Sequence, residues 1–293
     1  MSGKTSDFAI LVPASGTDEL HRTLSMLVFQ QEKDFHVYVI DPAKVIGIAP
    51  VVSEFEMRLS VDYLQVDPGN GPLLAAALPC LRGERYVCWL SSGVEFTPKS
   101  LLRMRRCIKD HPDYDVYHWN LEEPERKWKL KTRVDRIFTD VFCKGAAAPL
   151  SSMVFRTDTL RSALEGDPEA AGMDLAVILS CARQRPVRTT RWERISWTRP
   201  AVPADPSLQE KAIRDRLAFF RWSERFFGKE YPLDTGERLD LFASTLAELY
   251  PSYTPDELKE ELYGFAVVNG PIRKMKASSA MKAALKARQE SLK

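Results

Sequence analysis

Two short apolar segments with one helical pattern between them constrain this chain more than any other feature of its sequence. The first, Phe8 to Pro13, runs into the small-residue turn Ala14 to Gly16, and apolar residues then recur at helical spacing. The second, Phe35 to Asp41, is mostly apolar and ends on a carboxylate. Strand, helix and strand in this order predict a parallel pair of strands covered by the helix.

The same alternation continues to about residue 120. Gly69-Asn70-Gly71 precedes an alanine-rich helical segment, and Gly83-Glu84 precedes the predicted strand Tyr86 to Leu90. A helix over Pro98 to Asp110 and a strand over Asp113 to Trp119 follow. We therefore predict an α/β fold with a Rossmann-like, mostly parallel sheet and helices on both faces.

The character of the chain changes near residue 200. Pro200, Pro203 and Pro206 lie close together and predict a rigid linker. Beyond them apolar residues recur at helical spacing, and the end of the chain, residues 272–293, is basic. We divide the chain into an α/β domain, residues 1–200, and a helical C-terminal region, residues 207–293.

Composition excludes some classes of partner. The net charge is only +2, so no global field favours nucleic acid. The five cysteines lack zinc-ligand spacing, which indicates reduced thiols. The sequence has no secretory signal pattern and no apolar stretch of about 20 residues, so we expect a cytoplasmic protein. The basic tail predicts at most weak peripheral contact with the inner face of a membrane, and a solvated terminus is the alternative.

The order of these segments resembles the start of the family 2 glycosyltransferases. Val12-Pro13, Gln30 and Asp41 stand where that family has the same residues, and Gly69 and Gly83-Glu84 match its later pattern. Pro42-Ala43-Lys44 replaces the rest of the motif around Asp41, and Leu74 and Ala75 replace an Arg-Asn pair. The resemblance implies a GT-A fold that binds a nucleotide-diphosphate sugar.

The metal-binding motif of that family is rewritten in this chain. Leu90-Ser91-Ser92-Gly93-Val94, with Pro98 in register, stands where the family has Leu-Asp-x-Asp-Asp. Those carboxylates hold Mn²⁺ or Mg²⁺ against the diphosphate, and hard divalent cations prefer oxygen ligands of this kind. Glu95 is the one acid nearby, and the alternation of an extended segment places it off the usual position. We therefore predict no metal ligands and a metal-independent site, with Mn²⁺ or Mg²⁺ through Glu95 as the alternative.

The resemblance also implies which residues form the site. The residues expected to bind the nucleotide sugar are Pro13, Ser15, Asp41, Gly69, Ser91, Ser92 and Gly93. Asp41 is expected at the base or ribose, and Ser91 to Gly93 beneath the ribose and diphosphate. The glycine loop around Gly69 is by itself only a turn pattern.

Asp174 is the candidate catalytic residue. It stands at a helix start where the family has an acidic pair that supplies the base for the acceptor hydroxyl, and Met173 replaces the first acid. The alternative is that Asp174 only places a favourable negative charge in the first turn of its helix.

Without a metal, basic side chains must neutralise the diphosphate. One basic run spans Arg126 to Arg133, and a second follows the Asp174 helix. From the second we select Arg188 and Arg191, because guanidinium groups pair with phosphate oxygens through two hydrogen bonds. The alternative is that both runs are solvated surfaces.

Two hypotheses for function follow. The first is a glycosyltransferase that moves a sugar from a nucleotide-diphosphate donor to a glycan or lipid-linked acceptor. The second is a catalytically impaired GT-A domain that binds a nucleotide or a protein partner, which the missing acids favour. The sequence does not fix the sugar, the acceptor or the oligomeric state, and a homo-oligomer is left open.

Overall fold

The structure is a computed structural model that describes residues 6–67, 69, 71–91, 93–122, 133–143, 148–183, 185–197 and 205–233. The chain divides into two compact units, Met1–Arg199 and Pro200–Lys293. The predictions for the basic tail, residues 272–293, and for most of the first basic run fall outside the described residues.

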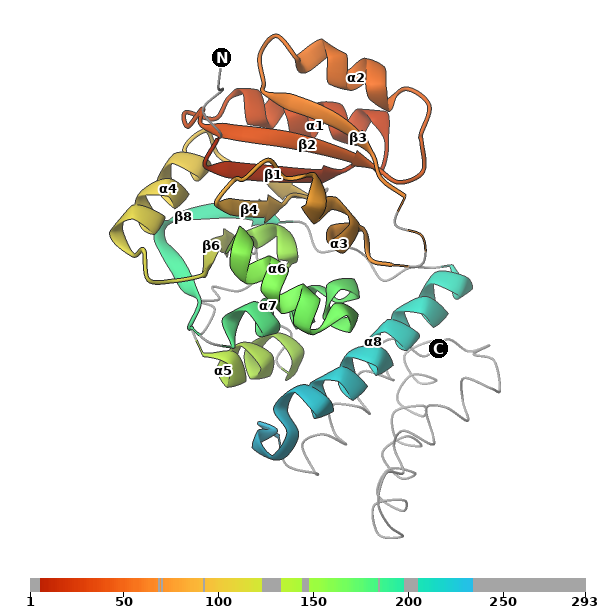
Figure 1. The fold of residues 1–293 in the computed structure, drawn as a ribbon, viewed down its shortest axis with the longest axis vertical. Helices are drawn as coiled ribbons and strands as arrows, with labels where there is room; N and C mark the ends of the chain where they lie inside the picture. Colours follow the sequence, from red (N-terminus) through yellow and green to blue (C-terminus); the bar gives the residue numbers. More distant parts are fainter. Residues whose placement is uncertain are drawn as a thin grey trace, which may run out of the picture. The chain divides into compact units, whose positions relative to one another are not determined.

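One mixed sheet organises the first unit (Figure 1). Within the described residues it holds eight strands in the order β3-β2-β1-β4-β7-β6-β8-β5. Their bounds are β1 (Phe8–Pro13), β2 (Phe35–Asp41), β3 (Val61–Gln65), β4 (Tyr86–Trp89), β5 (Val94–Glu95), β6 (Val116–Glu122), β7 (Met153–Arg156) and β8 (Arg188–Trp197).

Helices connect these strands and lie around the sheet (Figure 1). They are α1 (Thr17–Val28), α2 (Ile48–Phe55), α3 (Leu73–Ala77), α4 (Ser100–Asp110), α5 (Val134–Phe138), α6 (Thr157–Gly166) and α7 (Asp174–Ala182). Short helical turns are η1 (Leu78–Cys80), η2 (Thr139–Cys143), η3 (Leu150–Ser152) and η4 (Pro168–Gly172). The second unit contributes α8 (Pro206–Phe227) and η5 (Gly228–Glu230).

The predicted α/β class with a mostly parallel sheet is confirmed. Strands β3, β2, β1 and β4 are parallel neighbours, and β6 and β8 also pair in parallel. Strand β7 runs antiparallel to both β4 and β6. Therefore β6 points the same way as β4, and the C-terminal ends of β1, β2, β4 and β6 lie at one edge of the sheet.

Some predicted boundaries move by a few residues. Strand β6 begins at Val116 rather than Asp113, and the Asp115 carboxylate just before it lies 3.6 and 3.9 Å from Arg156 and Arg185. Residues 61–65 form β3 and residues 188–197 form β8, and the sequence patterns predicted neither strand.

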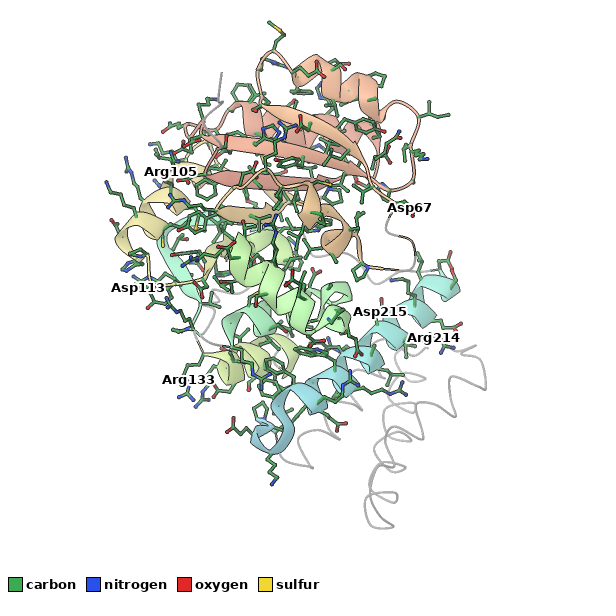
Figure 2. The ribbon with its side chains drawn as sticks, viewed as in Figure 1. Asp67, Arg105, Asp113, Arg133, Arg214 and Asp215 are labelled. Atoms are coloured by element: carbon green, nitrogen blue, oxygen red, sulfur yellow. The ribbon has the colours of Figure 1, made fainter. Side chains whose placement is uncertain are left out.

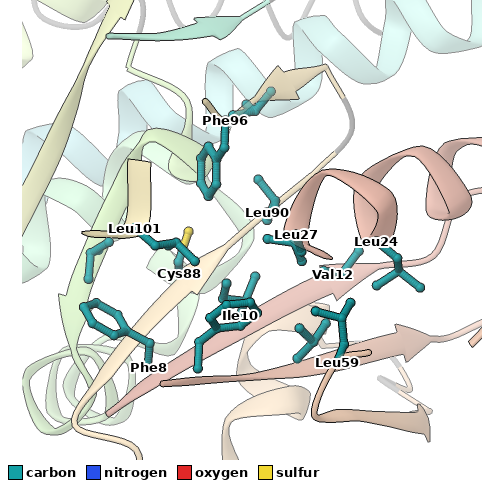
Figure 3. Packing of buried hydrophobic residues seen from close by; sticks show 14 of the residues in the cluster. Phe8, Ile10, Val12, Leu24, Leu27, Leu59, Cys88, Leu90, Phe96 and Leu101 are labelled. Atoms are coloured by element: carbon teal, nitrogen blue, oxygen red, sulfur yellow. The ribbon is translucent and has the colours of Figure 1, made fainter. Parts of the chain in front are cut away.

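The main hydrophobic core lies on one face of the sheet. Alternate residues of β1, Phe8, Ile10 and Val12, pack against Leu24 and Leu27 of α1 (Figure 3). Helices α2 and α4 and the alternate residues of the other strands complete this cluster. Fully burying one such side chain contributes about 1.5–3 kcal/mol, so this face supplies much of the stability of the unit.

The alternate residues of each strand that do not enter the main core face the opposite side of the sheet. Met153 and Phe155 of β7 alternate with Val154, which belongs to the main core, so they face away from it. Helix α6 contacts β7 on this side, and α7 contacts both α6 and β6. This face, here called the α7 face, leads to the candidate site.

Gln30 joins the end of α1 to the start of α4. Its side chain is buried, with Nε2 donating to the Thr97 carbonyl at 2.8 Å and Oε1 accepting from the Leu101 N–H at 3.2 Å. The Leu101 N–H is one of the amides that a helix start leaves without an internal partner. Gln30 therefore fixes the segment that follows Ser91.

We expect Gln30→Leu to lower the free energy of unfolding by about 1–3 kcal/mol, because it leaves the buried Leu101 N–H without its partner. The same change at its exposed neighbour, Gln31→Leu, serves as the control and should cost less than about 0.5 kcal/mol. Urea unfolding measures both. Equal losses in the two variants would show that Gln30 does not anchor α4.

Candidate functional site

The predicted site residues gather at the edge where the parallel strands end. Pro13 is the last residue of β1 and Asp41 the last of β2, while Ser91 follows β4 by two residues. Asp67 of the neighbouring glycine loop lies on the same side of the sheet in Figure 2. Ligands of open α/β sheets usually bind outside this edge.

Ser91 is bonded to a segment far away in the sequence. The Ser151 Oγ accepts a hydrogen bond from the Ser91 N–H at 3.1 Å and lies 2.5 Å from the Ser91 Oγ. Ser151 belongs to η3, just before β7, and is fully buried. The pair therefore joins the segment that follows β4 to the antiparallel part of the sheet.

The adjacent residue carries the connection on to Asp174. The Leu150 N–H donates to the Asp174 carboxylate at 3.4 Å. Ser91 and Asp174 are thus linked through two consecutive residues, Leu150 and Ser151. These contacts bring Ser91 and Asp174, which are 83 positions apart in the sequence, to the same part of the molecule.

The glycine loop also approaches Asp174. Pro72 begins the turn into α3, and a methyl group placed on Gly172 would lie 3.7 Å from its Cγ. Helix α3 contacts η4, which ends at Gly172, two residues before Asp174. Gly69 is exposed, adopts φ 53°, and donates its N–H to the Asp67 carboxylate at 2.8 Å.

The buried carboxylate of Asp41 is hydrogen-bonded to other residues of the protein. Its carboxylate is 0% exposed; Oδ1 accepts from the N–H groups of Ala43 and Val45, and Oδ2 accepts from the Tyr63 hydroxyl at 2.7 Å. Asp41 therefore holds the turn after β2 and orients Tyr63. Tyr63 is half-buried at the same edge of the sheet.

The remaining nucleotide-site predictions are placed at this edge in part. Ser15 is exposed and its hydroxyl donates to Glu19 in the first turn of α1. Gly93 is exposed with φ 86°, a backbone conformation that favours glycine. Ser92 lies outside the described residues.

Arg188 does not join this group. It begins β8 opposite Tyr117, at the other edge of the sheet, with its guanidinium 2.5 Å from the His111 ring and over the Tyr114 ring. Asp113, near this cluster in sequence, lies across the molecule from Asp67 in Figure 2.

Arg191 lies further along β8. Its backbone falls in an irregular stretch, since Thr189 pairs with His118 and Arg194 with Asn120. This stretch lies beside the C-terminal half of β6, towards the edge that holds Ser91. The side chain of Arg191 is outside what the structure describes.

The described residues around Ser91 do not form a set of ligands for a divalent cation. The Ser91 hydroxyl is engaged by Ser151, and Glu95 is exposed on the two-residue strand β5 opposite Ser196. In the parts of the chain that the structure describes, no three His, Cys, Asp or Glu side chains gather as metal ligands. Mg²⁺ and Mn²⁺ need oxygen ligands, usually with carboxylates among them.

The surroundings of Asp174 alter its acidity. Asp174 is exposed by its accessible surface, yet protein atoms crowd around its carboxyl, disfavour the charged form and raise the pKa above the ordinary 3.8. The Leu150 N–H opposes this shift because it stabilises the carboxylate. A raised pKa is the property expected of a carboxylate that accepts a proton during a reaction.

Sequence reasoning missed Ser151 and Tyr63. No pattern in the sequence pairs Ser151 with Ser91. Tyr63 lies on β3, which was not predicted. Both roles arise from contacts between distant segments.

The sheet order, the site at its C-terminal edge and the helix that begins at Asp174 define a GT-A-like α/β fold, the fold of many glycosyltransferases. Solved structures with the same fold include TarS of S. aureus. Its fragment 1–349 in complex with UDP-GlcNAc superposes with a TM-score of 0.55 at 12% identity, covering 98% of this chain and 91% of that fragment.

Two further structures of TarS show the same similarity of fold. The fragment in complex with UDP gives a TM-score of 0.54 at 13% identity, covering 98% of this chain and 91% of the fragment. The longer TarS structure gives 0.54 at 14% identity, and the alignment covers 97% of this chain and 55% of TarS. The chain thus spans about half the length of that longer protein.

No protein-family model matches the chain, and no curated protein sequence matches it. The likeness therefore establishes the fold. Within the described residues, no helix has the length and apolar character needed to cross a bilayer.

The raised pKa of Asp174 predicts how stability depends on pH. Above its folded-state pKa the ionised carboxylate opposes folding, and this penalty disappears as pH falls below the unfolded value near 3.8. We expect Asp174→Asn to raise Tm at pH 7, with the gain shrinking towards pH 4. Thermal unfolding at both pH values measures the difference.

Asp158, exposed in the first turn of α6, provides the control. Asp158→Asn removes only a favourable helix-terminal charge, so it should lower stability by about 0.3–1 kcal/mol at pH 7. If Asp174→Asn also lowered stability at pH 7, Asp174 would be only a first-turn charge.

Proposed function

We propose that this chain is a metal-independent glycosyltransferase that moves a sugar from a nucleotide-diphosphate donor to a hydroxyl of a glycan or lipid-linked acceptor. One observation carries the proposal: the carboxylate of Asp174 is tied through Leu150 and Ser151 to Ser91, at the edge where the strands of a GT-A-like sheet end. TarS, whose fold is similar, was solved with UDP-GlcNAc and with UDP.

In this proposal Asp174 is the general base. Its carboxylate takes the proton of the acceptor hydroxyl as the hydroxyl oxygen forms a bond to the anomeric carbon. The bond from that carbon to the diphosphate oxygen breaks, and the nucleotide diphosphate leaves. The raised pKa of the carboxyl makes Asp174 a better proton acceptor than an ordinary surface aspartate.

The nucleotide would lie along the edge from β2 to β4. Asp41 acts as a positioning residue, because its buried carboxylate reaches a ligand only through Tyr63 and the turn that it holds. Pro13, Ser15 and Gly69 line the edge, and the Ser91 and Gly93 region lies beneath the diphosphate.

Neutralisation of the diphosphate is proposed for Arg191 rather than Arg188. The backbone of Arg191 lies in the part of β8 beside Asn120, whereas Arg188 is engaged at the opposite edge. A guanidinium presents two parallel N–H groups to phosphate oxygens and so replaces part of the charge that a metal would supply.

The second candidate is a GT-A domain that binds a nucleotide or a partner without turnover. The neutral Ser91 and Gly93 in place of the family's acids favour it. The experiments below separate the two, since only a transferase depends on Asp174 for turnover.

We expect Asp174→Asn to reduce sugar transfer by about 10²–10⁴-fold, the usual contribution of a general base, and to change the Kd for UDP by less than about twofold. Transfer to a mixture of glycan and lipid-linked acceptors, followed with radiolabelled UDP-GlcNAc and GDP-mannose, measures turnover. Undiminished transfer in the variant would remove Asp174 as base.

Nucleotide binding should not need a divalent cation. We expect calorimetric titrations with UDP and with GDP to give the same Kd, within about twofold, in EDTA and in Mn²⁺, because the described residues hold no cluster of three His, Cys, Asp or Glu side chains that could bind the ion. Binding seen only with Mn²⁺ would contradict the metal-independent site and would implicate Glu95. Absence of binding under both conditions would contradict the transferase itself.

A further inference from the structure

Two polar side chains on β6 are buried on the α7 face without full hydrogen bonding. His118 is 2% exposed and Asn120 is 9% exposed. The Nε2 atom of His118 and the Oδ1 atom of Asn120 have no hydrogen-bond partner. Leaving such a group unpaired costs about 1–3 kcal/mol, so an unpaired acceptor beside a candidate site calls for an explanation.

Both side chains share the face that holds Asp174. Their neighbours on the strand, Tyr117 and Trp119, belong to the main core on the opposite face. His118 pairs with Met153, which faces away from that core. Helix α7 contacts β6 on this side.

Asn120 is the member closer to the site. Strand β6 runs antiparallel to β7, with His118 opposite Met153. The pairing ends there, because the partner chain turns into η3 just before Met153, and β6 contacts η3, which holds Ser151. Ser151 bonds Ser91, and its neighbour Leu150 bonds Asp174.

The position suits the sugar rather than the nucleotide. Ser91 follows β4, and Asn120 lies two strands further along the sheet, because β7 stands between β4 and β6. With strands about 4.8 Å apart, the two residues are separated by about 10 Å across the sheet. With the diphosphate above Ser91, this separation would place the hexose attached to the diphosphate near Asn120.

The chemistry of the pair suits hydroxyl groups. An amide both donates and accepts, so it matches a sugar hydroxyl, which does the same. Burial lowers the pKa of His118 to about 3, so the neighbouring ring is neutral at physiological pH. A neutral pair of this kind offers no charge to a phosphate.

We propose that the Asn120 side chain binds a hydroxyl of the donor sugar. Its Oδ1, which has no hydrogen-bond partner in the free protein, accepts a hydrogen bond from that hydroxyl. This inference rests on the proposed function and names a residue for the sugar that the earlier site did not contain. Asn120 is a substrate-binding residue and takes no part in proton transfer.

The test compares two ligands that differ only by the sugar. For wild type and Asn120→Ala, calorimetry gives the Kd for UDP and for UDP-GlcNAc, with GDP and GDP-mannose as a second pair. For the sugar nucleotide that wild type binds, we expect Asn120→Ala to raise the Kd about tenfold, the change expected from the loss of one hydrogen bond. The Kd for the matching nucleotide diphosphate should change by less than about twofold.

Thermal stability separates binding from folding. The free protein gains nothing from the unpaired Oδ1 of Asn120, so we expect the Tm of Asn120→Ala to equal or exceed that of wild type. Thr189→Val is the matched control: Thr189 pairs with His118 towards the other edge, and its variant should keep the wild-type ratio of affinities.

The outcomes are distinct. An equal loss of affinity for both ligands, or no loss for either, would overturn the assignment of Asn120 while leaving the proposed function intact. A fall in Tm with unchanged affinity ratios would make Asn120 a structural residue. If wild type bound no nucleotide at all, the proposed function would fail, and this inference with it.

Discussion

The hydrogen bonds between Ser91 and Ser151 are the contact on which the site depends. They join the parallel strands β1 to β4, which form one side of the site, to the η3 turn and β7 on the other. The backbone N–H of the neighbouring residue, Leu150, donates a hydrogen bond to Asp174. The two segments are thus held together by a pair of neutral hydroxyl groups. Its site is therefore organised by direct contacts within the protein.

The fold was largely predictable from the sequence because the strands near the N-terminus are local patterns. The apolar runs at 8–13 and 35–41, with a helical pattern between them, determine both the elements and their parallel pairing. Strand β8 was missed because its first seven residues, Arg188 to Arg194, are mostly charged or polar. It is stabilised as a strand by pairing with β6 and β5, which no local pattern reveals.

The site was predictable only where the family resemblance supplied positions. Asp174 and Ser91 were identified in this way, and the structure brings them together. Asp41 was expected at the ligand and instead carries three internal hydrogen bonds. Arg188 was chosen for the charge and geometry of its guanidinium, and these do not say at which edge of a sheet a strand begins. Ser151, Tyr63 and Asn120 depend on contacts or registers between distant strands, so single-sequence reasoning had no means of finding them.

The irregular pairing between β6 and β8 has a consequence for how such a site diversifies. From His118 to Asn120 the chain advances two residues, while the partner advances five, from Thr189 to Arg194. Regular pairing resumes afterwards, and Trp197 still reaches Val94 on β5. Extra residues can therefore be added or removed at the rim beside Asn120 without disturbing the register on either side. In an evolving lineage, this stretch offers a place where the surface beside Asn120 changes while the fold is preserved.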